Sequence, residues 1–141
     1  MWKYTTSLVC GIVIGVVIDR VAQYIKINRQ LKYSKVLEEC FGEPMYTNTF
    51  TLSDVVNWSK AREEQIKSGN KIAVVKASPE KIKEFVNDLE IGKGVDNYLI
   101  IALVSENNKE IVESMLVKYE KLDKPLEEQL NKGNGSMVIE G

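Results

Sequence analysis

The segment YLIIALV, residues 98–104, is the most continuous apolar run outside the N-terminal region, and it decides the predicted fold. Strands that are buried on both faces have such unbroken runs, whereas half-exposed strands alternate apolar and polar residues. We therefore expect 98–104 to be a central strand of a sheet. A second strand is predicted over KIAVVKA (71–77), a β-branched run that lies between Asn70 and the pair Ser78-Pro79.

The sequence around these two strands alternates between helix and strand patterns. Ser78 and Pro79 suit the first positions of a helix, and apolar residues follow at helical spacing from Ile82 to Leu89. Beyond 98–104 the patterns predict, in order, a polar turn, a hairpin partner with one wetter face over 111–122, a helix capped by Asp123, and a closing strand over 136–140. From residue 71 onward the predicted order is therefore strand, helix, strand, strand, helix, strand.

That order is the split βαβ pattern of ferredoxin-like sheets, and we expect its helices to lie on one face. A βα unit precedes it, because MYTNTFTL predicts a strand over 46–51 and Ser53 can cap a helix that runs to Ser68 and stops at Gly69. The sequence thus predicts an α+β fold with a ferredoxin-like sheet, preceded by an extra βα unit and an N-terminal hydrophobic helix. This fold class hosts many unrelated functions and by itself assigns none.

The stretch SLVCGIVIGVVIDR, residues 7–20, contains eleven consecutive apolar or Gly residues. A cleavable export signal needs small residues at a cleavage site after such a run, but Asp19 and Arg20 follow it. We therefore expect the segment to stay on the chain and to cross a membrane as a short span, since a span needs about 20 residues. A buried first helix of a soluble fold and a helix lying in the membrane interface are the alternatives.

Charge is divided unevenly along the chain. Residues 1–40 hold six basic and three acidic residues, which leaves 13 basic and 17 acidic residues for 41–141. Positive charge on the C-terminal side of a span favours the cytoplasmic side for that end. We therefore expect contact with membrane lipid through residues 4–25 and a single-pass topology with a cytoplasmic C-terminal domain. The net charge of −1 offers no basic surface of the kind that nucleic-acid binders carry, so no nucleic-acid partner is expected.

Three parts of the chain are predicted. Residues 1–25 form a transmembrane or membrane-associated helix, residues 26–43 a juxtamembrane helical stalk, and residues 44–141 a small α+β domain. The boundary follows from Gly42 and Pro44, because Pro cannot continue a helix. The stalk contains too few heptads for a coiled coil, which favours a single helix packing on the domain.

Ser7, Gly11 and Gly15 repeat every four residues within the N-terminal helix. Small residues at this spacing form a flat strip where the backbone of another helix can approach closely. Self-association of the helix through this strip is one hypothesis. A chance pattern in an apolar run that contains Gly is the alternative.

The chain lacks the residue types of common catalytic sites. It contains no His, which excludes His-based triads and most zinc sites. Cys10 and Cys40 differ too much in setting to predict a disulfide, and the glutamates beside Cys40 should raise the pKa of its thiol. The segments GKG (92–94) and GNG (133–135) lack the other residues of phosphate-binding motifs and are interpreted as turns. No catalytic residue, metal site or cofactor is predicted.

These observations predict a membrane-tethered, non-enzymatic domain for protein–protein interaction or scaffolding. We expect contact with a protein partner through a sheet edge or through the helix that carries Trp58, a residue type enriched at binding hot spots. Self-association, if it occurs, is expected through the N-terminal helix. Burial of Trp58 in the core is the structural alternative. The second functional hypothesis is a small-ligand-binding regulatory module, soluble or oligomeric through the N-terminal helix, with a site lined by the loops 92–97 and 133–136.

Overall fold

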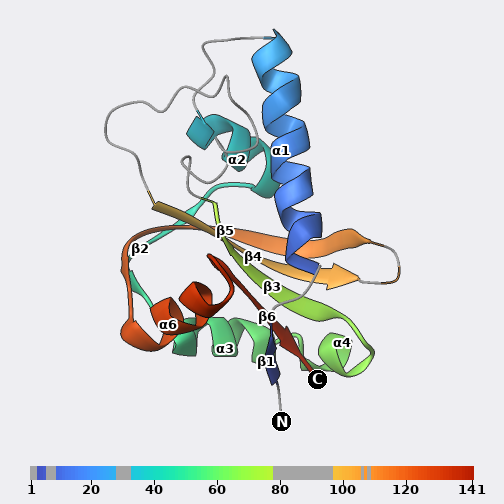
Figure 1. Cartoon of the computed structure of the whole chain (residues 1–141), viewed down its shortest axis with the longest axis vertical. Helices are drawn as coiled ribbons and strands as arrows, with labels where there is room; N and C mark the ends of the chain where they lie inside the picture. The colour runs from blue at the N-terminus through green and yellow to red at the C-terminus, as the bar shows by residue number, and fades with distance from the viewer. Residues whose placement is uncertain (1–2, 6–8, 28–32, 78–96, 106, 108) are drawn as a thin grey trace.

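The computed structural model describes residues 3–5, 9–27, 33–77, 97–105, 107 and 109–141 (Figure 1). Within these residues one mixed sheet contains six strands: β1 (Lys3–Thr5), β2 (Met45–Phe50), β3 (Lys71–Lys76), β4 (Asn97–Ser105), β5 (Glu110–Leu122) and β6 (Ser136–Glu140). The strand order is β1-β6-β3-β4-β5-β2. β2 runs parallel to β5, and the other neighbouring pairs in this order are antiparallel.

Helices cover both faces of this sheet (Figure 1). The upper face in Figure 1 carries α1 (Val9–Ile27) and α2 (Tyr33–Phe41). The lower face carries α3 (Leu52–Lys60), α4 (Glu63–Lys67) and α6 (Lys124–Lys132). The α+β class is therefore confirmed. The described helices of the body, α3, α4 and α6, share one face, and the N-terminal helices α1 and α2 cover the other.

β4 shows why the sheet needs a helical layer on each side. From Leu99 to Val104 every side chain is fully buried, and successive side chains of a strand point to opposite faces. Ile100 and Ala102 belong to the upper core with α1 and α2, whereas Leu99 and Ile101 belong to the lower core with α3 and α6. The prediction of a central strand over 98–104 is confirmed.

An apolar stripe holds α1 on the sheet. Val9, Val13 and Val17 recur every four residues, at most 1% of each is exposed, and all three join the upper core. The thiol of Cys10 donates a hydrogen bond of 3.5 Å to the backbone oxygen of Met137 in β6. In this structure α1 is thus a core helix of the fold, which is one of the alternatives to a membrane span.

Among the described residues, no helix is both long enough and apolar enough to cross a membrane. The span predicted for the N-terminal region stays a prediction. Within that region Lys3–Thr5 form the strand β1, which pairs antiparallel with β6 and places Tyr4 opposite Ile139.

The N-terminal elements and the body share the same sheet and the same upper core. β1 is an edge strand of the sheet, and α2 buries Val36 and Leu37 in the upper core. The predicted division near residue 44 into a stalk and a domain stays a prediction. α2 packs on the domain as a single helix, as expected.

The helical segment after β2 begins earlier than predicted and is broken. Thr51, not Ser53, is the N-cap: its side chain accepts a hydrogen bond of 3.0 Å from the N–H of Asp54, whose carboxylate accepts one of 3.0 Å from the N–H of Thr51. This reciprocal capping box satisfies two N–H groups that a helix start leaves without partners. The single helix predicted up to Gly69 is instead α3 and α4. Gly69 follows α4 with a φ of +108°, which favours Gly.

The strand order corrects the ferredoxin-like prediction. In a split βαβ unit another strand lies between the two strands that the first helix joins, but here β3 and β4 are direct antiparallel neighbours. The hairpin of β4 with β5, the helix α6 capped by Asp123 and the closing strand β6 are confirmed. The helix predicted after Pro79 lies outside the described residues.

The two-sided burial of β4 makes Ile100 and Ile101 equally sensitive to truncation. Each of Ile100→Ala and Ile101→Ala should lower the free energy of unfolding by about 2–5 kcal/mol, the usual cost of such a cavity. Urea unfolding checks this, with Lys121→Ala at an exposed position of β5 as the control expected within about 0.5 kcal/mol of wild type. If helices covered only one face, one of the two isoleucine variants would behave like the control.

Candidate interaction sites

One edge of the sheet is formed by β2 and the first half of β5. β2 pairs with β5 from Val117 to Leu122, whereas β4 pairs with β5 from Glu110 to Tyr119. Among the described residues no strand therefore pairs with the outer side of β2 or with that of Glu110–Leu116. We call these two segments together the β2–β5 edge. Backbone N–H and C=O groups along such an edge can pair with another strand.

Large apolar side chains are exposed along the β2–β5 edge. The exposed fractions are 69% for Tyr46, 41% for Met45 and 50% for Val112. In the described part of the chain the other large apolar side chain that is similarly exposed is Tyr4, at 40%, on the opposite edge strand β1. The ammonium of Lys118 lies 5.2 Å from the centroid of the Tyr46 ring, within cation–π range.

A β-bulge accounts for the position of Val112. Leu103 of β4 faces Glu113, and the next residue, Val104, faces Ile111, so Val112 is an extra residue on β5. Bulges locally interrupt strand pairing and redirect side chains. The bulge thus adds an exposed apolar side chain to the part of β5 that β2 does not cover.

Asp123 fixes the C-terminal end of β2. Its carboxylate oxygen Oδ1 accepts hydrogen bonds of 3.1 Å from the N–H of Leu126, which caps α6, and from the N–H of Leu52, at the start of α3. Its own N–H donates a bond of 3.0 Å to the backbone oxygen of Phe50. The α6 cap was predictable from local sequence, but the bonds to Leu52 and Phe50 join segments about 70 residues apart and leave no local signal.

Trp58 makes its observed contacts within the chain. Its half-buried indole packs against the lower core, and the guanidinium carbon of Arg62 lies 3.5 Å from the ring centroid. Arg62 also donates hydrogen bonds of 2.8 Å to the backbone oxygen of Trp58 and to Glu113 Oε2. A second bond, from Arg62 Nη2 to Glu113 Oε1, makes that ion pair bidentate. The partner contact proposed for Trp58 stays a prediction. Its packing against the lower core and its contacts with Arg62 favour the alternative, in which Trp58 belongs to the core.

The Gly strip of α1 lies on the side away from the sheet. Gly11 and Gly15 are exposed, and a Cβ atom added to either would meet nothing within 4 Å. Ser7 lies outside the described residues. Helix association through these three positions stays a prediction.

The loops proposed for a ligand site differ in what the structure describes. Most of 92–97 lies outside the described residues. The GNG segment forms the turn between α6 and β6: Gly135 has a φ of +94°, and the hydroxyl of Ser136 donates a bond of 2.9 Å to the backbone oxygen of Gly133. Its interpretation as a turn is confirmed.

Cys40 lies half-buried on α2 and packs against the upper core. Burial is the main cause that raises the pKa of its thiol, the charge of Arg20 lowers it, and that of Glu39 raises it. The predicted direction is confirmed, although burial contributes more than the neighbouring carboxylate. A thiol with a raised pKa is a poor nucleophile at neutral pH.

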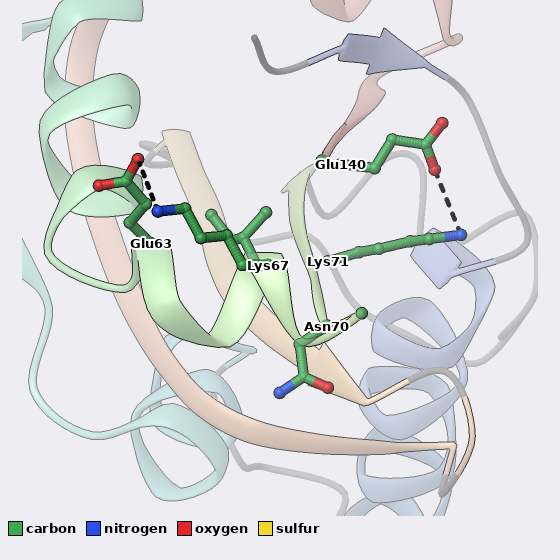
Figure 2. Close-up of a pocket in the computed structure, with 8 residues that line it drawn as sticks. Glu63, Lys67, Asn70, Lys71 and Glu140 are labelled. Atoms are coloured by element: carbon green, nitrogen blue, oxygen red, sulfur yellow. Dashed lines mark ion pairs between the residues drawn. The ribbon is translucent and has the colours of Figure 1, made fainter.

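A pocket of about 440 Å³ lies where α4 meets the start of β3 and the end of β6 (Figure 2). On one side Lys67 Nζ is 4.0 Å from Glu63 Oε1, and on the other side Lys71 Nζ is 3.3 Å from Glu140 Oε2. Asn70 also lines the pocket, and in Figure 2 its side chain lies below both pairs and points away from them. The residues come from segments about 70 positions apart in the sequence, so sequence analysis did not identify the pocket.

Comparison with protein-family models, with curated proteins and with solved structures finds no match for the chain. No group of three or more Cys, Asp or Glu side chains in the described ranges is placed to hold a metal ion.

The Arg62–Glu113 pair should give stability a defined pH dependence. The hydrogen bonds from Arg62 lower the pKa of the Glu113 carboxyl, so the pair stabilises the folded state above the unfolded-state pKa of about 4.3. This contribution is lost as the pH falls through the lowered pKa of the folded state.

Glu113→Gln should therefore be less stable than wild type at pH 7, by less than about 1 kcal/mol because about half of the Glu113 side chain is exposed to solvent. At pH 3 this difference in unfolding free energy between the variant and wild type should be smaller. Urea unfolding at both pH values measures it, with Glu110→Gln on the same strand as the control. An equal gap at both pH values would show that the carboxylate charge is not involved.

Proposed function

We propose that this chain is a non-enzymatic interaction domain that binds an extended segment of a partner protein along the β2–β5 edge. The observation that carries the proposal is the exposure of Met45, Tyr46 and Val112 on this one edge. An added strand would satisfy the outward backbone groups. The exposed side chains would supply apolar contact on both faces of the sheet, because the consecutive residues Met45 and Tyr46 point to opposite faces.

The composition of β2 supports this proposal. Proteins commonly protect edge strands with charged residues, with Pro, or by making the strand very short. β2 is six residues long and reads Met-Tyr-Thr-Asn-Thr-Phe, without charge and without Pro. β1, at the opposite edge, is three residues long and includes Lys3. β1 is thus short and charged, two features that prevent strand addition, and β2 has neither.

Membrane association of the same chain is also proposed, with α1 as the contact. No charged residue occurs from Val9 to Ile18. On the side of α1 away from the sheet, Gly11 and Gly15 are exposed and Val16 and Ile18 are half-buried. A helix that packs on the sheet with one side can place its other side in a membrane interface. The basic balance of residues 1–40 supports a cytoplasmic position for the body.

Fractionation of the full-length chain followed by an alkaline wash of the membranes tests this association. An interfacial helix should appear in the membrane fraction and be released by the wash, whereas a spanning helix should resist it. Recovery of all the protein in the soluble fraction would contradict membrane association in either form.

Strand binding at the β2–β5 edge can be tested with displayed random decapeptides selected on the full chain. Tyr46→Glu, at a position exposed enough to tolerate it, adds a charge of the kind that blocks strand addition. It should weaken the selected peptides at least about tenfold, equivalent to about 1.4 kcal/mol. The matched control is Tyr4→Glu on β1, which should bind as wild type does.

Backbone amide shifts in NMR should map the bound peptides to β2 and to Glu110–Leu116. Peptides that bind wild type and Tyr46→Glu equally, or that shift amides on other elements, would contradict the proposed site.

A further inference from the structure

The pocket beside α4 has dimensions and charges that suit a small ligand. Its volume of about 440 Å³ lies within the range of about 300–1,000 Å³ that is usual for small-molecule sites. β4 and β5 separate β3, which borders this pocket, from β2. The pocket is therefore distinct from the β2–β5 edge, and its occupant is independent of the proposed partner strand.

The four charged side chains of the pocket form two ion pairs on opposite sides (Figure 2). Two Lys and two Glu give no net charge, so an anion attracted to a lysine is also repelled by the adjacent glutamate. The same cancellation applies to a simple cation. A simple ion gains the small net attraction that remains at one pair, whereas a ligand with a positive end and a negative end gains it at both pairs.

The two pairs differ in how readily they can exchange partners. Glu63 and Lys67 are 4.0 Å apart, and more than half of each side chain is exposed, so their attraction is weak and screened by solvent. Lys71 and Glu140 are 3.3 Å apart with about a fifth to a quarter of each side chain exposed. A change of partner therefore costs less free energy at the first pair than at the second, which links β3 to β6.

The remaining lining leaves space for the body of a ligand. Ile66 also lines the pocket, although only 2% of this residue is exposed, while Gly69 and Gly141 line it without side chains. A Cβ atom at Gly141 would lie 3.5 Å from the backbone oxygen of Ile66. The charged pairs on two sides of the pocket, with space between them, complement an amino acid or a short peptide, which carries opposite charges at its two ends.

We propose that this pocket binds a small zwitterion of the amino acid or dipeptide class. The ligand carboxylate pairs with Lys67 on the α4 side, and the ligand ammonium pairs with Glu140 on the β6 side. Each charge of the ligand adds an attraction at one pair, so a ligand with a single charge should bind more weakly.

Titration of the ¹⁵N-labelled full chain with L-alanyl-L-alanine tests the proposal. The amide signals of Gly69 and Asn70 should shift with saturation. The N-acetylated dipeptide keeps only the carboxylate and the dipeptide amide keeps only the ammonium, and each should bind at least about tenfold more weakly.

Two variants separate the pocket from non-specific charge effects. Lys67→Met removes an exposed cation of the pocket and should weaken the binding of L-alanyl-L-alanine at least about threefold. Lys60→Met, at an exposed position of α3 that does not line the pocket, should bind as wild type does. The proposal is overturned by absence of saturable shifts at Gly69 and Asn70, by equal binding of the capped forms, or by shifts confined to β2.

Discussion

Burial of β3 and β4 on both faces is the constraint on which the rest of the structure depends. Ile72–Val75 and Leu99–Val104 are at most 2% exposed, so a helical layer on one side alone would leave half of these side chains in water. At about 25 cal/mol per Å² of apolar surface, such exposure is unfavourable enough to prevent folding. α1 and α2 meet this demand above the sheet, and α3, α4 and α6 meet it below.

This constraint gives the N-terminal apolar run a role within the domain. Val9, Val13 and Val17 form the buried stripe, while Gly11 and Gly15 face outward. Both sets are spaced four residues apart, so the sequence alone cannot show which set faces the sheet. An apolar run also satisfies a membrane and a protein core equally well, because both environments exclude water.

Local patterns were sufficient for most described elements of the body, but not for the break between α3 and α4 or for the strand order. β3, β4, β5, β6 and α6 follow from apolar runs, polar turns and the Asp123 cap. The adjacency of β3 and β4 depends on long-range pairing, which leaves no local signal, and so the ferredoxin-like order was wrong. β1 was missed because three residues, Lys3–Thr5, are too few to show a strand pattern.

The candidate sites depend even more on tertiary structure. A sheet edge was expected to be a contact surface, but the strand order was needed to place β2 at an edge and to expose Tyr46 and Met45. Trp58 was identified from its residue type, whereas its partner Arg62 is fixed by Glu113, 51 positions away. The pocket joins α4 to β6, and no spacing in the sequence brings Lys67 and Glu140 together.

The position of α1 on the sheet is tested most directly by comparing the unfolding free energies of Val13→Asp and Gly15→Asp with that of wild type. The packing described here predicts that Val13→Asp, which buries a charge against β3, loses several kcal/mol or fails to fold. Gly15→Asp, which faces outward, should stay within about 1 kcal/mol of wild type. Wild-type stability of the body in both variants would contradict this position of α1, because a helix that stands away from the sheet would tolerate both changes.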